Sequence, residues 1–73
     1  METYLRVTFS SEGIPPSEVA ERLRTLGFKP TQGNYDFIYD WKRSVSLDDA
    51  MDLSVQLTSA LKGARVLFES ETV

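Results

Sequence analysis

The sequence predicts an α+β domain, in which a four-stranded antiparallel sheet carries two helices on one face. Three features of the chain support this prediction. Residues 3–10 and 64–68 alternate between apolar and polar side chains, as half-buried strands do. Two segments between those strands repeat their apolar residues at helical spacing. The stretch 33–43 (GNYDFIYDWKR) has aromatic residues at every second position and begins with a Gly-Asn pair, which is a hairpin signal.

Length and composition limit what the chain can be. Its 73 residues suffice for one domain, residues 1–73, and a domain this small buries only roughly 60% of the surface that its unfolded chain exposes. The chain has no cysteine for disulfides and no histidine for the usual zinc sites. No apolar run approaches the ~20 residues needed to span a bilayer, and no secretory signal is visible. We therefore expect a soluble, cytoplasmic domain.

The first strand and the first helix follow from local patterns. The strand residues that are expected to face the core are Leu5, Val7 and Phe9. Consecutive prolines after the strand suit the first turn of a helix, which is predicted over residues 16–26. The apolar face of this helix consists of Val19, Ala20, Leu23 and Leu26. Gly27 follows the last apolar residue and is expected to end the helix in a left-handed conformation.

The pair Gly33-Asn34 determines how the middle strands are arranged. In a two-residue turn at this pair, Gln32 lies opposite Tyr35 and the next pair inward is Pro30 with Phe37. This register places four residues on one face of the hairpin, namely Phe28, Pro30, Phe37 and Tyr39. Proline has no N–H group to donate to a ladder, so the strand that contains Pro30 is predicted at an edge of the sheet.

The second helix is predicted to begin after Ser46, which approximates a capping box with Asp49, and to end before Gly63. Its core-facing stripe is predicted as Leu47, Ala50, Ser54, Leu57 and Leu61, with Leu53 at the edge. Met51 and Val55 lie on the flank of this stripe. We expect them to pack on the first helix, and a small apolar patch for a partner is the alternative. Residues 71–73, after the last strand, are expected to fray.

The order strand, helix, strand, strand, helix, strand resembles that of ferredoxin-like domains. The resemblance implies a two-layer βαββαβ sandwich with the spatial strand order 4-1-3-2 and both helices on one face. Such a topology transfers no activity by itself. The predicted core consists of Leu5, Val7, Phe9, Leu23, Leu26, Phe37, Tyr39, Leu57, Leu61, Val66 and Phe68, with Trp41 partly covered at a strand end.

The face of the sheet without helices is the main candidate surface for function. It is predicted to carry Tyr4, Arg6, Thr8, Asp36, Ile38, Asp40, Arg65, Leu67 and Glu69. The two arginines are expected to pair with the acidic residues of this face, and such exposed pairs contribute little stability. An apolar centre around Ile38 with a polar rim is typical of an interface. The sequence therefore predicts self-association or a protein partner here, and a solvated face is the alternative.

Asp48, Asp49 and Asp52 gather carboxylates at the start of the second helix and are a candidate site for calcium or magnesium. The helix dipole and capping explain acidic residues at this place equally well. The same cluster, or Asp36 with Asp40, is the alternative for acid–base chemistry. The latter two lie roughly 13 Å apart along a strand, which exceeds the carboxylate spacing of glycosidases.

No residue is assigned a catalytic role, because a chain without Cys or His lacks the usual nucleophile–base pairs. No cofactor is expected, since the glycine motifs of nucleotide-binding loops are absent. The net charge of −3 and the lack of a basic, aromatic pattern disfavour nucleic acid. We therefore interpret the chain as a small binding or protein-interaction module that self-associates through its open sheet face. A divalent-cation or acid–base protein and a weak nucleic-acid binder are the alternatives, and a small ligand stays open.

Overall fold

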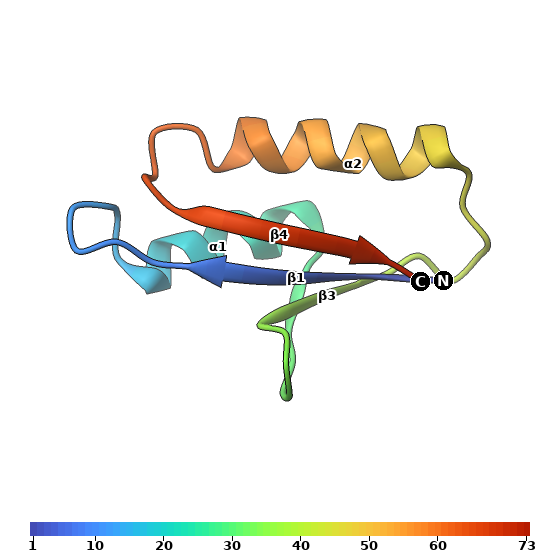
Figure 1. The fold of residues 1–73 in the computed structure, drawn as a ribbon, viewed down its shortest axis with the longest axis horizontal. Coiled ribbons are helices and arrows are strands. Elements are labelled where there is room, and N and C mark those ends of the chain that lie inside the picture. The colour runs from blue at the N-terminus through green and yellow to red at the C-terminus, as the bar shows by residue number, and fades with distance from the viewer.

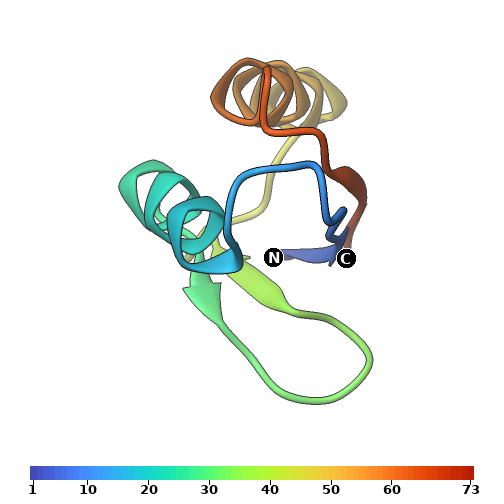
Figure 2. The same cartoon turned by 90° about the vertical axis from the view of Figure 1, so that its left-hand side faces the viewer.

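The computed structural model describes residues 1–73 and has the predicted ferredoxin-like βαββαβ order (Figure 1). The elements are β1 (Glu2–Thr8), α1 (Pro16–Leu26), β2 (Lys29–Pro30), β3 (Phe37–Asp40), α2 (Leu47–Ala60) and β4 (Leu67–Thr72). The sheet is antiparallel, and its strand order is β2-β3-β1-β4. Both helices lie on the same side of the sheet, and the β2–β3 hairpin projects away from them (Figure 2). Neither helix is long and apolar enough to cross a membrane.

β1 is the central strand that connects the two halves of the sheet. It pairs with β3 through Leu5 and Phe37 and with β4 through Val7 and Phe68. Leu5 and Val7 are buried as predicted, but the prediction that Phe9 faces the core is wrong, because 41% of its surface is exposed. β1 ends at Thr8, opposite the first residue of β4. Phe9 therefore lies beyond the paired part of the sheet.

The end of α1 follows the predicted glycine cap. Gly27 has a φ of 108°, and its N–H donates to the Arg24 carbonyl. The next N–H, that of Phe28, donates to the Leu23 carbonyl, so that two carbonyls of the last turn are satisfied. This turn directs Phe28 into the core, where it is almost fully buried. The glycine cap thus places an aromatic side chain beneath the helix that it ends.

The chain reverses direction around Gly33, and the predicted register of Pro30 opposite Phe37 is confirmed. The predicted two-residue turn is wrong, because the last hairpin bond runs from the Thr31 N–H to the Asp36 carbonyl. Asp36 instead turns toward β1. Its N–H donates to the Leu5 carbonyl, and its carboxylate accepts from the Val7 N–H at 2.8 Å. This competition with β1 opens the hairpin into a wider loop.

α2 begins with the predicted capping box between Ser46 and Asp49. Its core-facing stripe differs from the prediction. Leu53 is buried rather than peripheral, whereas Ser54 and Leu47 are exposed. Met51 and Val55 do not pack on α1 as expected, since 58% and 67% of their surfaces are exposed. The helix therefore presents an uncovered apolar flank.

β4 begins at Leu67, three residues later than the alternation suggested, and it does not fray at its end. Glu2 and Val73 exchange two backbone hydrogen bonds of 2.9 Å, so the chain termini lie side by side (Figure 1). The buried core consists of Leu5, Val7, Val19, Leu23, Phe28, Phe37, Leu53, Leu57 and Leu61. Leu26, Tyr39, Trp41, Val66 and Phe68 pack against it and are partly buried.

Candidate interaction surfaces

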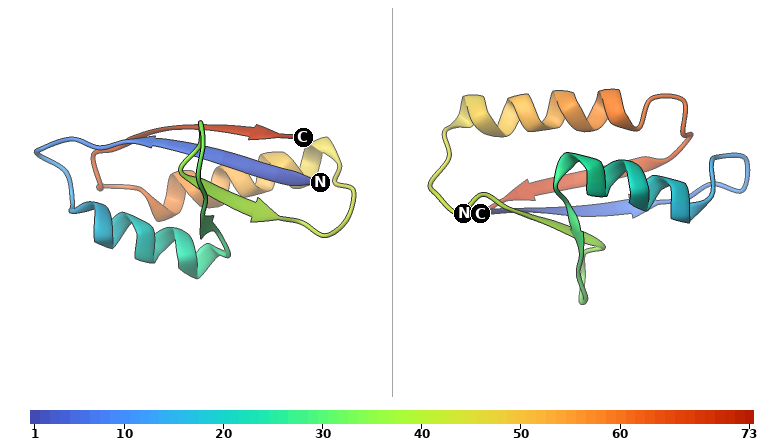
Figure 3. Two further views of the ribbon diagram at one scale, coloured as in Figure 1. Left: turned by 90° about the horizontal axis from the view of Figure 1, so that it is seen from below. Right: turned by 180° about the vertical axis from the view of Figure 1, so that it is seen from behind.

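Cross-strand pairing defines the open face of the sheet, which Figure 3 (left) shows from below. The pairs Tyr4–Ile38 and Tyr4–Glu71 place these three residues on one side of the sheet, and the alternation of each strand assigns the others. Of the predicted residues, the strands bring Tyr4, Arg6, Thr8, Ile38, Asp40, Leu67 and Glu69 to this face. Glu2 and Glu71, which were not predicted, join them.

Two predicted members of the open face are placed differently. Asp36 lies in the hairpin loop and fixes the β1 backbone through Val7. Arg65 precedes β4 with a φ of 58° and pairs with Glu12 at 3.5 Å. The predicted ion pairs of Arg6 with the acidic residues of this face are also not formed. Arg65 lies two residues before the start of β4, so the alternation of strand residues does not apply to it.

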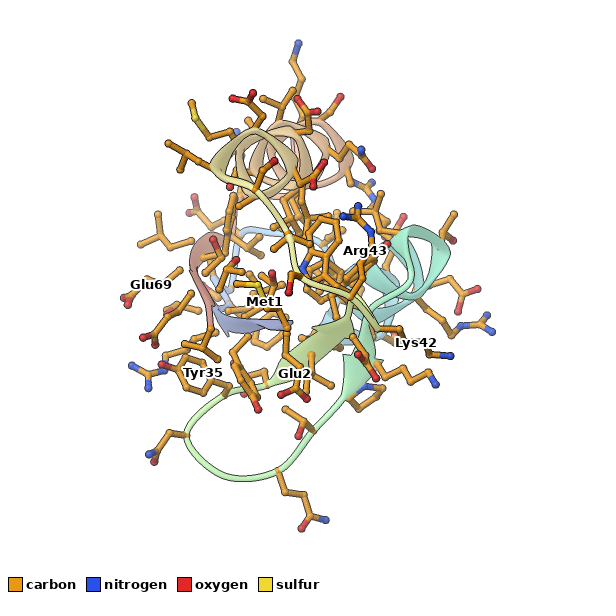
Figure 4. The ribbon with its side chains drawn as sticks, turned by 90° about the vertical axis from the view of Figure 1, so that its right-hand side faces the viewer. Met1, Glu2, Tyr35, Lys42, Arg43 and Glu69 are labelled. Atoms are coloured by element: carbon orange, nitrogen blue, oxygen red, sulfur yellow. The ribbon has the colours of Figure 1, made fainter.

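Tyr35 attaches the hairpin loop to the open face, a contact that the sequence pattern did not predict. Its ring lies 5.2 Å from the Tyr4 ring and 5.2 Å from the Arg6 guanidinium. Its hydroxyl donates to the Glu71 carboxylate, and Arg6 donates to the Asn34 carbonyl at 3.0 Å. Figure 4 shows Tyr35 below the sheet, on the side away from α2. The loop is therefore attached to both β1 and β4.

The hydrogen bond to Glu71 has an electrostatic consequence. It stabilises the neutral phenol, and partial burial and the negative charge of Glu71 act in the same direction, so the pKa of Tyr35 is raised above its usual value of 10.0. Tyr35 therefore keeps its donor proton to a higher pH than an unperturbed tyrosine does.

This contact reduces the apolar area that the open face offers. Tyr4 and Ile38 are only partly exposed, whereas Leu67, at the β4 side of the face, is 74% exposed. Self-association through the centre of this face stays a prediction. Light scattering tests it: a dimer that Ile38→Glu converts to a monomer supports it, and a wild-type monomer at every concentration contradicts it.

The two edges of the sheet differ in their capacity to accept another strand. The β2 edge is two residues long and contains Pro30, which cannot donate. The β4 edge is six residues long, without proline, and no strand lies on its outer side. Because Glu2 and Val73 form a hydrogen-bonded pair, the alternation of an antiparallel ladder directs the backbone groups of Phe68, Ser70 and Thr72 outward.

A groove of about 280 Å³ runs between α2 and this free edge. Its walls are formed by Leu47, Ala50, Met51, Leu53, Ser54 and Leu57 of α2, Thr3 of β1, and Ser70 and Thr72 of β4. Leu47, at 75% exposure, and Met51 are large apolar side chains that remain open to solvent at this wall. Leu47 and Met51 are four residues apart and therefore share one side of the helix, which is the sequence signal for this wall.

The groove side and the open side of β4 differ in chemistry. Ser70 and Thr72 face the helices, and the Thr72 hydroxyl lies 2.8 Å from that of the buried Thr3. Glu69 and Glu71 face the opposite side, and neither forms an ion pair. Figure 4 shows Glu69 extending away from the sheet. The free edge therefore combines an apolar groove with an acidic rim.

The acidic start of α2 contributes to capping of the helix N-terminus. Asp49 accepts from the Ser46 N–H at 3.3 Å and from Arg43 at 3.1 Å. The Arg43 hydrogen bond, and after it the backbone bond from Ser46, hold the pKa of the Asp49 carboxyl below its usual value. Asp49 is thus committed to capping, and Asp48 and Asp52 are exposed. The structure contains no group of three or more acidic, cysteine or histidine side chains arranged to hold a metal ion.

The arginines offer little free positive charge for nucleic acid. Four of the five are paired with carboxylates, as Arg22–Glu18, Arg24–Glu21, Arg43–Asp49 and Arg65–Glu12. Arg43 also lies over the Trp41 ring, 5.4 Å from its centre. No cluster of basic side chains accompanies the two tyrosines on the open face, where the carboxylates of Glu2, Glu69 and Glu71 predominate.

Comparison with protein-family models, with curated proteins and with solved structures found no match to this chain.

Proposed function

We propose that this protein is an interaction module that binds an extended segment of a partner protein as an additional strand beside β4. The observation that carries the proposal is the free edge itself, with the outward backbone groups of Phe68, Ser70 and Thr72 beside an apolar groove. Strand addition obtains affinity from main-chain hydrogen bonds and specificity from side-chain pockets. β4 supplies the first and the groove under α2 supplies the second.

The asymmetry between the two edges supports the choice of β4. Proteins commonly protect exposed edges with short strands or proline, and β2 has both. β4 has neither, and its groove wall bears exposed Leu47 and Met51. Large apolar side chains grouped beside unpaired backbone groups are typical of sites that accept a partner.

A peptide-display selection on the immobilised protein tests this proposal, with binding mapped by amide NMR shifts. We expect enriched peptides to shift the amides of Phe68, Ser70 and Thr72. Ser70→Pro should abolish binding, because it removes an outward N–H but no bond to β1. Ser70→Ala keeps the N–H and is the matched control, which should bind as the wild type does.

A second variant is needed because a loss of binding in Ser70→Pro alone does not distinguish the missing N–H from a folding defect. Met51→Glu introduces a charge into the groove wall at an exposed position and leaves the strand unchanged. It should weaken the binding of the same peptides by tenfold or more. Selected peptides that bind equally well to Ser70→Pro and Met51→Glu, or that shift only amides elsewhere, would overturn the proposal.

A further inference from the structure

We infer that the segment bound beside β4 alternates apolar and basic side chains, with the apolar ones in the groove and the basic ones opposite Glu69 and Glu71. This inference rests on the proposed strand addition and assigns the chemistry of the partner. It follows from the difference between the two sides of β4, an apolar groove on one and acidic side chains on the other. Successive residues of an added strand point alternately to these two sides.

The geometry of a sheet fixes which partner residues meet which surface. Residues directly opposite one another on neighbouring strands point to the same side. Partner residues opposite Ser70 and Thr72 therefore enter the groove beneath α2, where Leu47 and Met51 are exposed. The residue opposite Phe68 points to the same side of the sheet. The intervening residues project from the open face. Their neighbours there are Glu69 and Glu71, which have no ion-pair partner within the chain.

A second copy of this chain is a poor occupant of the same edge. Because the outward hydrogen-bonding groups belong to Phe68, Ser70 and Thr72, two-fold pairing of β4 with itself must be centred on a residue. Under this constraint, pairing joins the most strand residues when it is centred at Glu69 or at Ser70. In the first register, the Glu69 residues of the two chains lie opposite each other. In the second, Glu69 lies opposite Glu71 of the other chain. Like charges directly opposite one another destabilise a sheet, whereas opposite charges stabilise it. The acidic rim thus opposes self-pairing and favours a basic strand.

The test uses two end-blocked synthetic peptides, Val-Lys-Val-Lys-Val and its counterpart Val-Glu-Val-Glu-Val. We expect the lysine peptide to bind the wild type about tenfold more tightly, or better, because two attractive cross-strand pairs replace two repulsive ones. Its binding should shift the Phe68, Ser70 and Thr72 amides. In a Glu69→Lys/Glu71→Lys variant the preference should reverse, so that the glutamate peptide binds more tightly.

The outcomes separate this inference from the proposed function. If both peptides bind the β4 amides with equal affinity, or if peptides from the display selection bind there without basic residues, strand addition stands and the charge assignment is wrong. If no peptide of any kind shifts those amides, both fail. A preference for lysine that persists in the charge-reversed variant also overturns the inference, because it would not arise from Glu69 and Glu71.

Discussion

Gly27 is the glycine at which a left-handed backbone and a close neighbour coincide. Its φ is 108°, and an added Cβ would lie 2.9 Å from the Tyr39 ring. Gly33 has a similar φ of 103°, but an added Cβ there would meet nothing within 4 Å. The two positions therefore separate backbone strain from steric overlap.

We predict that Gly27→Ala destabilises the fold by about 2–3 kcal/mol, and that Gly33→Ala costs about 1 kcal/mol from backbone strain alone. Urea unfolding of the two variants and the wild type measures the difference. Equal losses at both positions would show that the Tyr39 ring moves aside without cost, which would contradict close packing of this ring against Gly27.

Asp49 predicts how stability depends on pH in the acid range. The pKa of its carboxyl is lower in the folded protein than in the unfolded chain, so its contribution to stability is present above about pH 4 and is lost as the pH falls through the folded value. Asp49→Asn should therefore reduce stability at pH 7 and should have a smaller effect at pH 2–3.

Urea unfolding at both pH values tests this prediction. Asp48→Asn is the matched control, because it removes a neighbouring exposed carboxylate that accepts no hydrogen bond within the structure. Its effect should be small at either pH. If Asp49→Asn and Asp48→Asn gave the same pH dependence, the bonds from Arg43 and Ser46 would not be the source of the stabilisation.

At the scale of elements, the β2–β3 hairpin depends on one side chain from its loop. Tyr35→Phe retains the contacts with Tyr4 and Arg6 but removes the hydroxyl that donates to Glu71. We expect faster amide exchange in residues 31–36 and little change in the helices. Tyr35→Ala, which also removes the ring contacts, should produce a larger increase over the same residues.

The raised pKa of Tyr35 adds a prediction in the alkaline range. Because the folded value exceeds the unfolded one, the contribution of the phenol is fully present below about pH 10 and is lost as the pH rises through the folded value. A phenolate absorbance titration should show a component above the usual tyrosine range, and Glu71→Gln should move this component to lower pH. No change in Glu71→Gln would contradict the Tyr35–Glu71 contact.

The elements also show what a sequence can predict. The Gly27 cap and the Ser46 capping box depend on residues close together in the chain, and both are confirmed. The stripe of α2 was ambiguous, because apolar residues surround more than half of the helix. Burying Leu53 instead of Ser54 is favoured by about 1.5–3 kcal/mol, and that preference decides which side faces the sheet. Leu47 is left outside as a consequence.

The candidate site was less predictable than the fold. The strand order followed from the βαββαβ order of the elements and the β2 edge from Pro30, and the structure confirms both. The groove depends on how far α2 lies from β4, a distance that no local pattern encodes. The Tyr35 contact joins residues 36 positions apart, from Tyr35 to Glu71. Alternation predicted the face of these strands correctly but not the loop that folds across it.

For the whole molecule, the distribution of acidic residues is expected to disfavour pairing of the open sheet edge with its own copies. One edge is short and contains Pro30, and the other is lined on its open side by Glu69 and Glu71. The two carboxylates that we propose select a basic strand are also expected to repel identical chains. Specificity for a foreign strand and protection against self-assembly would then have one physical origin.

We accordingly predict that Glu69→Thr/Glu71→Thr forms dimers or larger oligomers at neutral pH, because threonine favours strands and removes the like-charge pairs from the edge. Light scattering across a wide concentration range measures the mass. Asp48→Asn/Asp52→Asn changes the net charge equally at a site away from the edge and should behave as the wild type does. Adding Ser70→Pro to the threonine variant should return it to the wild-type mass, since the outward N–H that joins the copies is then missing. If the threonine variant associates no more than the wild type, Glu69 and Glu71 do not prevent self-pairing of β4. The same result would remove the electrostatic reason to expect a basic partner strand.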